Sequence, residues 1–241
     1  MIVARGLRRD FDRITAVAGI DFEVAAGEIV GLLGPNGAGK TTAMRMLNCS
    51  LPPTGGTAEV AGFDIRDRSR DVRRRVGFMP ENVALHPDAT VDELLRFTAD
   101  LKDVPRADLA DHLDGVMSRT GLADVRRRPV GQLSKGYRQR VGLAQALVGD
   151  PEILILDEPS VGLDPHQIVE IRELIRSFRG KRTVLLSSHI LGEVARICSR
   201  VMILDRGRLV LESAPEDLGG SLESVFLDLT RGGDAPPEAG A

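Results

Sequence analysis

The residues best suited to chemistry stand in a glycine-rich run at positions 34–41, which reads G-P-N-G-A-G-K-T. The run matches G-x-x-x-x-G-K-[ST], in which glycines let backbone N–H groups turn inward around phosphate oxygens. A predicted strand precedes it, and a predicted helix, 42–47, follows and adds the partial positive charge of its N-terminus. Lys40 is placed to reach the β- and γ-phosphates, and the Thr41 hydroxyl is placed for Mg²⁺. A mere glycine-rich turn is the alternative, and the flanking strand and helix disfavour it. We call this run the P-loop and predict that it binds nucleotide phosphates through Gly34, Pro35, Asn36, Gly37, Ala38, Gly39, Lys40, Thr41 and Thr42.

Two adjacent carboxylates, Asp157 and Glu158, follow a second apolar run, Ile153–Leu156. Neighbouring residues of a strand point to opposite faces, so the two acids have different roles unless the strand ends between them. We assign Asp157 to the Mg²⁺ shell and Glu158 to polarising the attacking water. An acidic strand end is by itself more often structural, but the P-loop upstream favours the catalytic interpretation.

A second candidate for binding phosphate is the sequence L-S-K-G-Y at positions 133–137. The stretch Lys135–Leu147 has helical periodicity, so Ser134 and the N–H groups near Gly136 form another anion-binding helix end. One chain has no obvious use for two phosphate sites on a single γ-phosphate, whereas two chains do. The alternative is a plain N-cap.

The elements that must position these residues have the rhythm of an α/β protein. The apolar runs Glu28–Leu33, Ile153–Leu156 and Thr183–Leu186 each end in polar residues and lead into a helical pattern. Ligands of parallel sheets bind beyond the carboxyl ends of the strands, so the polar clusters should converge on one edge. A small antiparallel sheet is predicted near the N-terminus, where residues 20–24 and 57–60 alternate.

The chain is expected to hold one nucleotide-binding domain over residues 1–225. Residues from about 82 to 149 have helical periodicity and predict a helical subdomain inserted into this domain. One helical face there should carry Val91, Leu94, Leu95, Thr98 and Leu101. Residues 226–241 end in a polar segment rich in glycine and proline, and we expect a flexible tail.

Composition restricts the partners. The chain has 241 residues, 42% of them hydrophobic, with a net charge of -3 and two cysteines. The weak negative net charge gives no general attraction to nucleic acid. Two cysteines without a pairing pattern suit a reducing compartment. The N-terminus lacks the apolar region of a signal peptide, and no apolar run approaches the ~20 residues that cross a bilayer. We therefore expect a cytoplasmic protein that reaches a membrane only from outside the lipid.

Taken together, these motifs resemble the ATP-binding cassette of ABC transporters. The resemblance covers residues 2–225 through five motifs in the family's order: the P-loop, L-S-K-G-Y, D-E-P at 157–159, G-L-D at 162–164 and a lone His189. It implies the P-loop NTPase fold, ATP and Mg²⁺ as ligands, and a head-to-tail dimer of two copies or two homologous cassettes with two ATP molecules between them. The partner implied on the membrane is a separate integral permease, docked around residues 81–101.

The resemblance also assigns single residues. It implies that Asp164 communicates between the two sites, that His189 contacts the γ-phosphate, and that the ring of Phe11 stacks on adenine. Glu81 stands where the family usually has a glutamine, so a direct metal contact is expected instead of an amide hydrogen bond. Lys135 and Tyr137 stand where glycine and glutamine are usual.

Three further readings bear on function. The sequence around Glu81, the G-L-D stretch and the S-S-H-I run is similar to that of cassettes of bacterial exporters and gliding-motility complexes. A soluble ABC-type ATPase acting on ribosomes or DNA is the alternative, but the second cassette, coiled-coil insertion or zinc-binding cysteines typical of such proteins are not found in this sequence. A binding module that scarcely hydrolyses ATP is disfavoured by Glu158.

Overall fold

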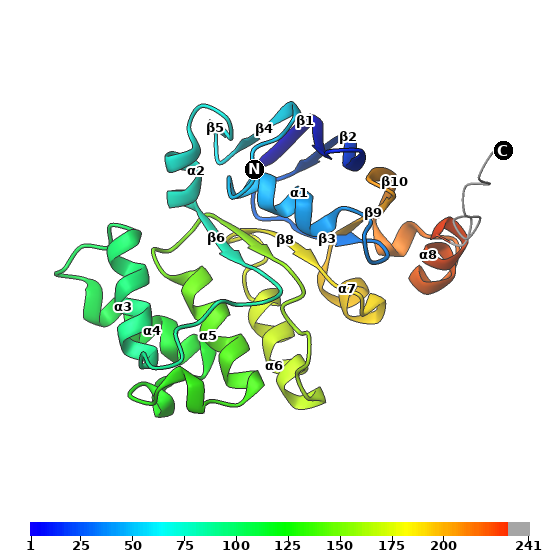
Figure 1. Cartoon of the computed structure of the whole chain (residues 1–241). Helices are drawn as coiled ribbons and strands as arrows, with labels where there is room; N and C mark the ends of the chain where they lie inside the picture. The colour runs from blue at the N-terminus through cyan, green and yellow to red at the C-terminus, as the bar shows by residue number, and fades with distance from the viewer. Residues whose placement is uncertain (231–241) are drawn as a thin grey trace.

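The computed structural model describes residues 1–230, which form two sheets and the helices around them (Figure 1). The larger sheet has the order β10-β9-β3-β8-β7-β6. The pairs from β9 to β6 are parallel, and β10 runs antiparallel to β9. The strands are β3 (Ile29–Leu33), β6 (Val76–Met79), β7 (Ile153–Leu156), β8 (Thr183–Ser187), β9 (Arg200–Asp205) and β10 (Arg208–Ser213).

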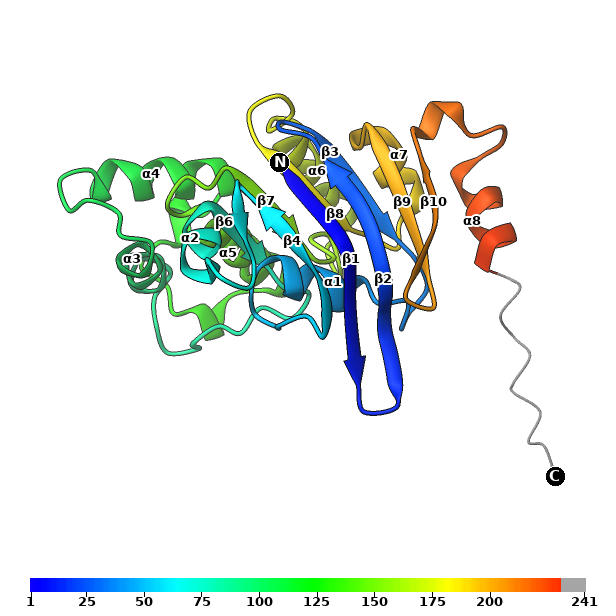
Figure 2. The same ribbon diagram turned by 90° about the horizontal axis from the view of Figure 1, so that it is seen from above.

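The smaller sheet confirms the antiparallel sheet predicted near the N-terminus. Its order is β2-β1-β4-β5, and every pair in it is antiparallel. It lies across one face of the larger sheet (Figure 2). Its strands are β1 (Ile2–Phe11), β2 (Ile14–Val24), β4 (Gly55–Val60) and β5 (Phe63–Asp64).

The central strands are apolar on both faces because each face is covered. All residues of β3, β7 and β8 are buried. Alternate side chains of β7 enter different cores: Ile153 packs with the small sheet and α1 (Lys40–Leu47), and Leu154 packs with the helices. This two-sided burial explains the continuous apolar runs and confirms the α/β class.

The helical segment, residues 82–149, lies between β6 and β7 and covers one end of the large sheet (Figure 1). It contains α3 (Val91–Leu101), α4 (Leu109–Thr120) and α5 (Lys135–Leu147). Thr90 begins α3 with a capping box to Glu93. Val91 and Leu95 are fully buried, but Leu101 is 67% exposed, because α3 ends at this residue beyond the reach of the core.

The remaining helices are α2 (Ser69–Arg75), α6 (Pro165–Arg176), α7 (Leu191–Ile197) and α8 (Leu222–Thr230). The last one differs from the expected flexible tail over 226–241, because residues 226–230 are helical. Leu222 is buried and Phe226 packs against the same core, which is the helical i, i+4 spacing. The rest of the expected tail, 231–241, lies outside the described residues. None of the helices within residues 1–230 has the length and apolar character to span a membrane.

Candidate functional site

A cavity of about 760 Å³ opens at the carboxyl ends of β3 and β7 and beside the segment that follows β8. This is the edge at which the polar clusters were expected to converge. Its walls come from the P-loop, from the loop after β6, from the segment after β7 and from the segment after β8. The lining residues are Ala16, Asn36, Gly37, Ala38, Gly39, Lys40, Thr41, Thr42, Glu81, Asp157, Glu158, Val161 and His189.

Two glycines give the P-loop its shape. Gly39 has φ 104°, and a Cβ there would clash with the backbone oxygen of Ala16. Gly34 has φ 153°, and a Cβ there would clash with the backbone oxygen of Leu204. Gly39 caps α1 without any side-chain hydrogen bond, so the first N–H groups of the helix are left for a ligand. A phosphate is the group that such a helix end binds.

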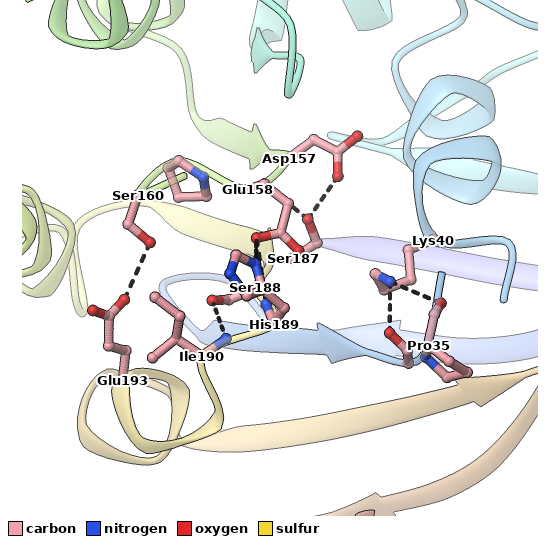
Figure 3. A network of polar contacts seen from close by, with 12 residues as sticks. Pro35, Lys40, Asp157, Glu158, Ser160, Ser187, Ser188, His189, Ile190 and Glu193 are labelled. Atoms are coloured by element: carbon pink, nitrogen blue, oxygen red, sulfur yellow. Dashed lines mark hydrogen bonds and ion pairs between the residues drawn. The ribbon is translucent and has the colours of Figure 1, made fainter. Parts of the chain in front are cut away.

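Lys40 lies inside the P-loop and points its ammonium at backbone oxygens (Figure 3). Its Nζ donates to the carbonyl of Gly34 at 2.6 Å and to that of Pro35 at 3.1 Å. Burial lowers the pKa of Lys40, and the negative charges of Glu158, Asp157 and Glu81 oppose this shift. The ammonium is therefore held next to the cavity by weak neutral acceptors that a phosphate can replace.

Asp157 and Glu158 both lie beyond the end of β7, which stops at Leu156. The strand alternation that would have sent them to opposite faces therefore does not apply, and both line the same cavity. Asp157 is 1% exposed. Its Oδ1 accepts from the Ser187 hydroxyl at 2.6 Å, and among the described residues its buried Oδ2 has no partner.

The orphaned oxygen of Asp157 fits a hard cation. Mg²⁺ prefers oxygen ligands and commonly uses one or two carboxylates together with substrate phosphates. Thr41 and Glu81 line the same cavity and offer further oxygens. Within residues 1–230 there is no group of three or more His, Cys, Asp or Glu side chains placed to hold a metal by themselves. The donor set therefore fits Mg²⁺ bound jointly with a nucleotide.

Glu158 and His189 form a pair at the mouth of the cavity (Figure 3). Nδ1 of His189 lies 2.7 Å from Oε2 of Glu158, and the His189 backbone N–H donates to the same oxygen at 3.3 Å. An ionised carboxylate only accepts, so Nδ1 carries the proton of this bond. Among residues 1–230, no hydrogen-bond partner is found for Nε2. The Glu158 side chain is 11% exposed and that of His189 is 60% exposed. The buried acid is thus reached from solvent beside the imidazole.

Gly34 and Pro35, whose carbonyls accept from Lys40, are not among the residues that line the cavity, and three predicted residues outside the P-loop do not line it either. Ser134 is exposed and caps α5 through a bond from the Tyr137 N–H at 3.4 Å. Gly136 is buried beneath the side chain of Gln167, where a Cβ would clash. Asp164 caps α6, accepting from the N–H of Gln167 at 3.0 Å. Within one chain, therefore, the second helix end and the G-L-D segment lie apart from the P-loop cavity.

Phe11 also stands outside the cavity lining. It ends β1 opposite Ile14, at the projecting hairpin of β1 and β2 (Figure 2). Its ring is 41% exposed, and the guanidinium of Arg9 lies 4.6 Å from the ring centroid. An adenine contact at Phe11 stays a prediction.

Two residues of this region received no role from the sequence. Ser187 bridges the acids, since its hydroxyl also accepts from the Glu158 N–H at 2.9 Å. Gln139, on α5, donates to the carbonyl of Glu158 at 3.3 Å. Ser187 carried one signal, its place in the polar cluster after the third apolar run. Nothing in the sequence distinguished Gln139 from the other polar residues of its helix.

Some known proteins are similar to this chain in sequence, and some solved structures are similar to it in fold. The family described as ABC transporter matches residues 17–161. Nod factor export ATP-binding protein I of Ralstonia nicotianae is 36% identical over 90% of this chain and 68% of its own length. The ABC transporter ATP-binding protein NatA of Bacillus subtilis is 36% identical over 89% of this chain and 88% of its own length.

Solved structures agree with these relatives. An ATP binding subunit of an ABC transporter has a TM-score of 0.88 at 28% identity, with 95% of this chain and 99% of that chain covered. The dimeric bacterial ABC transporter cassette MJ0796 has a TM-score of 0.82 at 24% identity, covering 89% of this chain and 98% of that one. At that identity the second similarity concerns the fold.

Proposed function

The chain belongs to the ABC transporter family of ATPases as an ATP-binding subunit, and from this premise we propose that two copies enclose and hydrolyse ATP to drive a separate membrane permease. Each active site would combine the P-loop cavity of one copy with the Ser134 helix end of the other. The two copies would close on ATP and separate after hydrolysis. This closing and opening would drive the conformational change of the permease.

The separation of the two phosphate-binding helix ends is the observation that carries this proposal. The N-terminus of α1 opens into the cavity, whereas Ser134 is exposed at the N-terminus of α5 and does not line it. A γ-phosphate held by the P-loop would be reached by an α5 N-terminus only from a second chain. The cassette MJ0796, which has the same fold, is described as dimeric.

Binding would begin at the P-loop. Phosphate oxygens would take the N–H groups at the start of α1 and attract the ammonium of Lys40 away from the carbonyls of Gly34 and Pro35. An ion pair with phosphate is stronger than a bond to a neutral carbonyl, so the exchange favours the bound state. Lys40 would then offset charge on the β- and γ-phosphates.

Magnesium would be held by the buried Oδ2 of Asp157 and the hydroxyl of Thr41, with Glu81 as a further oxygen donor. The bound ion would supply positive charge that offsets the negative charge developing on the phosphate. Ser187 keeps the Asp157 carboxylate in one orientation through the bond to Oδ1. Oδ2 is thereby kept available for the metal.

Glu158 would accept the proton of the attacking water. Its carboxylate is buried, and the His189 ring and backbone both donate to Oε2, which leaves Oε1 for the water. With Nδ1 donating to Glu158, His189 would donate from Nε2 to the γ-phosphate as the imidazolium, in which both ring nitrogens carry a proton. The two residues would thus orient water and phosphate from a single hydrogen-bonded unit.

The permease would dock in a second groove, of about 810 Å³, between the core and the helical segment. Phe97 and Leu101 of α3 line this groove and are 61% and 67% exposed. An apolar surface of the permease would bury these two side chains. Val83 and Leu85, in the loop after β6, pack instead against the protein's own core. The docking surface is therefore proposed at α3, within the predicted span 81–101.

We propose export as the direction of transport, because several relatives are named Nod factor export proteins. The alternative of a soluble ATPase acting on ribosomes or DNA is not favoured, since the relatives are ATP-binding proteins of ABC transporters.

Phosphate release measured at a series of chain concentrations tests the proposal. If two chains complete each site, the ATP turnover per chain rises with chain concentration and falls on dilution. A rate per chain that stays constant down to concentrations at which light scattering detects only monomers would overturn the shared site.

A further inference from the structure

Gln139 connects the helix that begins at Ser134 to the turn that carries Glu158. It is 6% exposed on α5, and its Nε2 donates to two backbone oxygens, those of Glu158 and Pro159, both at 3.3 Å. Buried polar groups are normally hydrogen-bonded, and here one side-chain amide donates to two successive backbone carbonyls. These two bonds restrain the orientation of both carbonyl groups. The helix is therefore bonded directly to the backbone of the acid that would activate water.

The backbone at Glu158 needs such support. Its φ is 51°, in the left-handed region that residues other than glycine rarely adopt. Such a conformation persists only where the surroundings hold it. The Ser187 hydroxyl accepts from the Glu158 N–H at 2.9 Å, and Gln139 donates to the Glu158 carbonyl. The two bonds hold the strained residue from both sides.

The partner-facing end of α5 contacts the same region a second time. Gly136 lies directly beneath the side chain of Gln167 of α6, and the Lys135 side chain packs over Gly162 of the G-L-D segment. These contacts leave α5 little freedom to shift without moving the segment after β7. A displacement of the Ser134 end would therefore reach Glu158 of the same chain.

We propose that Gln139 is a positioning residue for hydrolysis, which holds Glu158 of its own chain in register while Ser134 of that chain engages the nucleotide bound to the partner. The inference rests on the proposed function and deepens it. It assigns to Gln139 the connection between the two active sites of a dimer, since Ser134 serves one site and Glu158 the other.

The first test separates positioning from folding. Gln139→Leu and Gln139→Met both remove the donor; methionine matches the length of the glutamine side chain, and leucine is a shorter, branched replacement. We expect kcat for ATP hydrolysis to fall by about 10- to 100-fold, the scale of a small misplacement of a catalytic group, with KM changed less than about 3-fold. Thr120→Val is the matched control, because it also removes a buried side-chain bond to a backbone oxygen, 2.8 Å long, and Thr120 does not line the cavity. A wild-type kcat in both Gln139 variants, or equal losses of kcat in the control, overturns the proposal.

The second test asks whether Gln139 acts through Glu158. In a Glu158→Gln background the residual rate should be unchanged by Gln139→Leu, because two residues that act as one unit are not additive. A further loss of the same size as in the wild-type background would show that Gln139 acts elsewhere.

The third test decides which of the two sites Gln139 serves, by mixing pairs of impaired variants before ATP is added. Gln139→Leu mixed with Ser134→Arg should regain activity, because both changes fall on one site of the mixed dimer and leave the other intact. Gln139→Leu mixed with Lys40→Ala should not rise above the low rate of Gln139→Leu alone, because the two changes fall on different sites. The reverse pattern would place Gln139 with the Ser134 end and contradict the proposal.

Mixing Ser134→Arg with Lys40→Ala is the control for the shared site. Both changes fall on one site of the mixed dimer, so the other site should be active whether or not Gln139 positions Glu158. Failure of this control while Gln139→Leu still lowers kcat selectively would count against the proposed dimer and leave the positioning of Glu158 supported. Recovery in this control with a wild-type kcat in Gln139→Leu would count against the inference alone.

Discussion

The hydroxyl of Ser187 donates to Oδ1 of Asp157 at 2.6 Å, although the two residues are 30 positions apart in the chain. They meet because β7 and β8 are parallel neighbours whose carboxyl ends reach the same edge of the sheet. The same hydroxyl accepts from the Glu158 N–H at 2.9 Å. One small side chain thus fixes both the proposed magnesium ligand and the proposed water-activating acid.

Replacing Ser187 by alanine should weaken both folding and turnover. The buried Asp157 carboxylate would lose its donor and the Glu158 N–H its acceptor, which costs about 1–3 kcal/mol for a group left unsatisfied. Denaturant unfolding at fixed pH measures the stability loss, with Ser118→Ala, an exposed serine of α4, as the control. An unfolding midpoint equal to that of the wild type would show that the bridge contributes nothing.

Asp157→Asn should separate magnesium-dependent from magnesium-independent nucleotide binding. The amide is a poorer ligand than a carboxylate, so ATP affinity in the presence of Mg²⁺ should fall by roughly 10-fold or more, the loss that even outer partners of a metal site produce. ATP affinity in excess EDTA should stay close to that of the wild type. Isothermal titration with and without Mg²⁺ makes the comparison, and Asp111→Asn, an exposed residue of α4, is the control. Equal losses under both conditions would remove Asp157 from the metal shell.

Glu158→Gln should bind ATP and hydrolyse it about 100-fold more slowly or worse, because the amide cannot take a proton from water. With hydrolysis blocked, the closed pair of chains should accumulate and elute as a dimer when ATP is present. Phosphate release and size-exclusion chromatography with light scattering measure the two effects. Turnover at the wild-type rate would show that another residue activates the water.

Ser134→Arg should abolish turnover and leave nucleotide binding by the monomer within about 3-fold of the wild type. The larger side chain blocks the approach of the α5 N-terminus and removes its cap, which by itself costs about 1 kcal/mol. Ser118→Arg places the same side chain on another exposed helical site and should leave both properties unchanged. Parallel loss of binding and turnover in Ser134→Arg would argue against a site shared between two chains.

Much of the proposed site follows from the sequence because its parts are local. The P-loop needs glycine at positions whose backbone a Cβ would block, and Ser134 caps the helix that its own periodicity predicts. Asp157 and Glu158 follow an apolar run that predicts a buried strand, which is β7 in the structure. Turn, cap and strand signals act over a few neighbouring residues, so a single chain displays them without knowledge of the rest of the fold.

The tertiary structure decided which individual side chains meet at the predicted edge. Strand pairing, and not any local pattern, brought Ser187 to Asp157 and His189 to Glu158. Helix packing placed Gln139 beneath the Glu158 turn and left Leu101 exposed at the end of α3. Periodicity predicts which face of an element is apolar, but the neighbour that covers this face depends on strand order and helix packing, which are set by contacts between residues far apart in the chain.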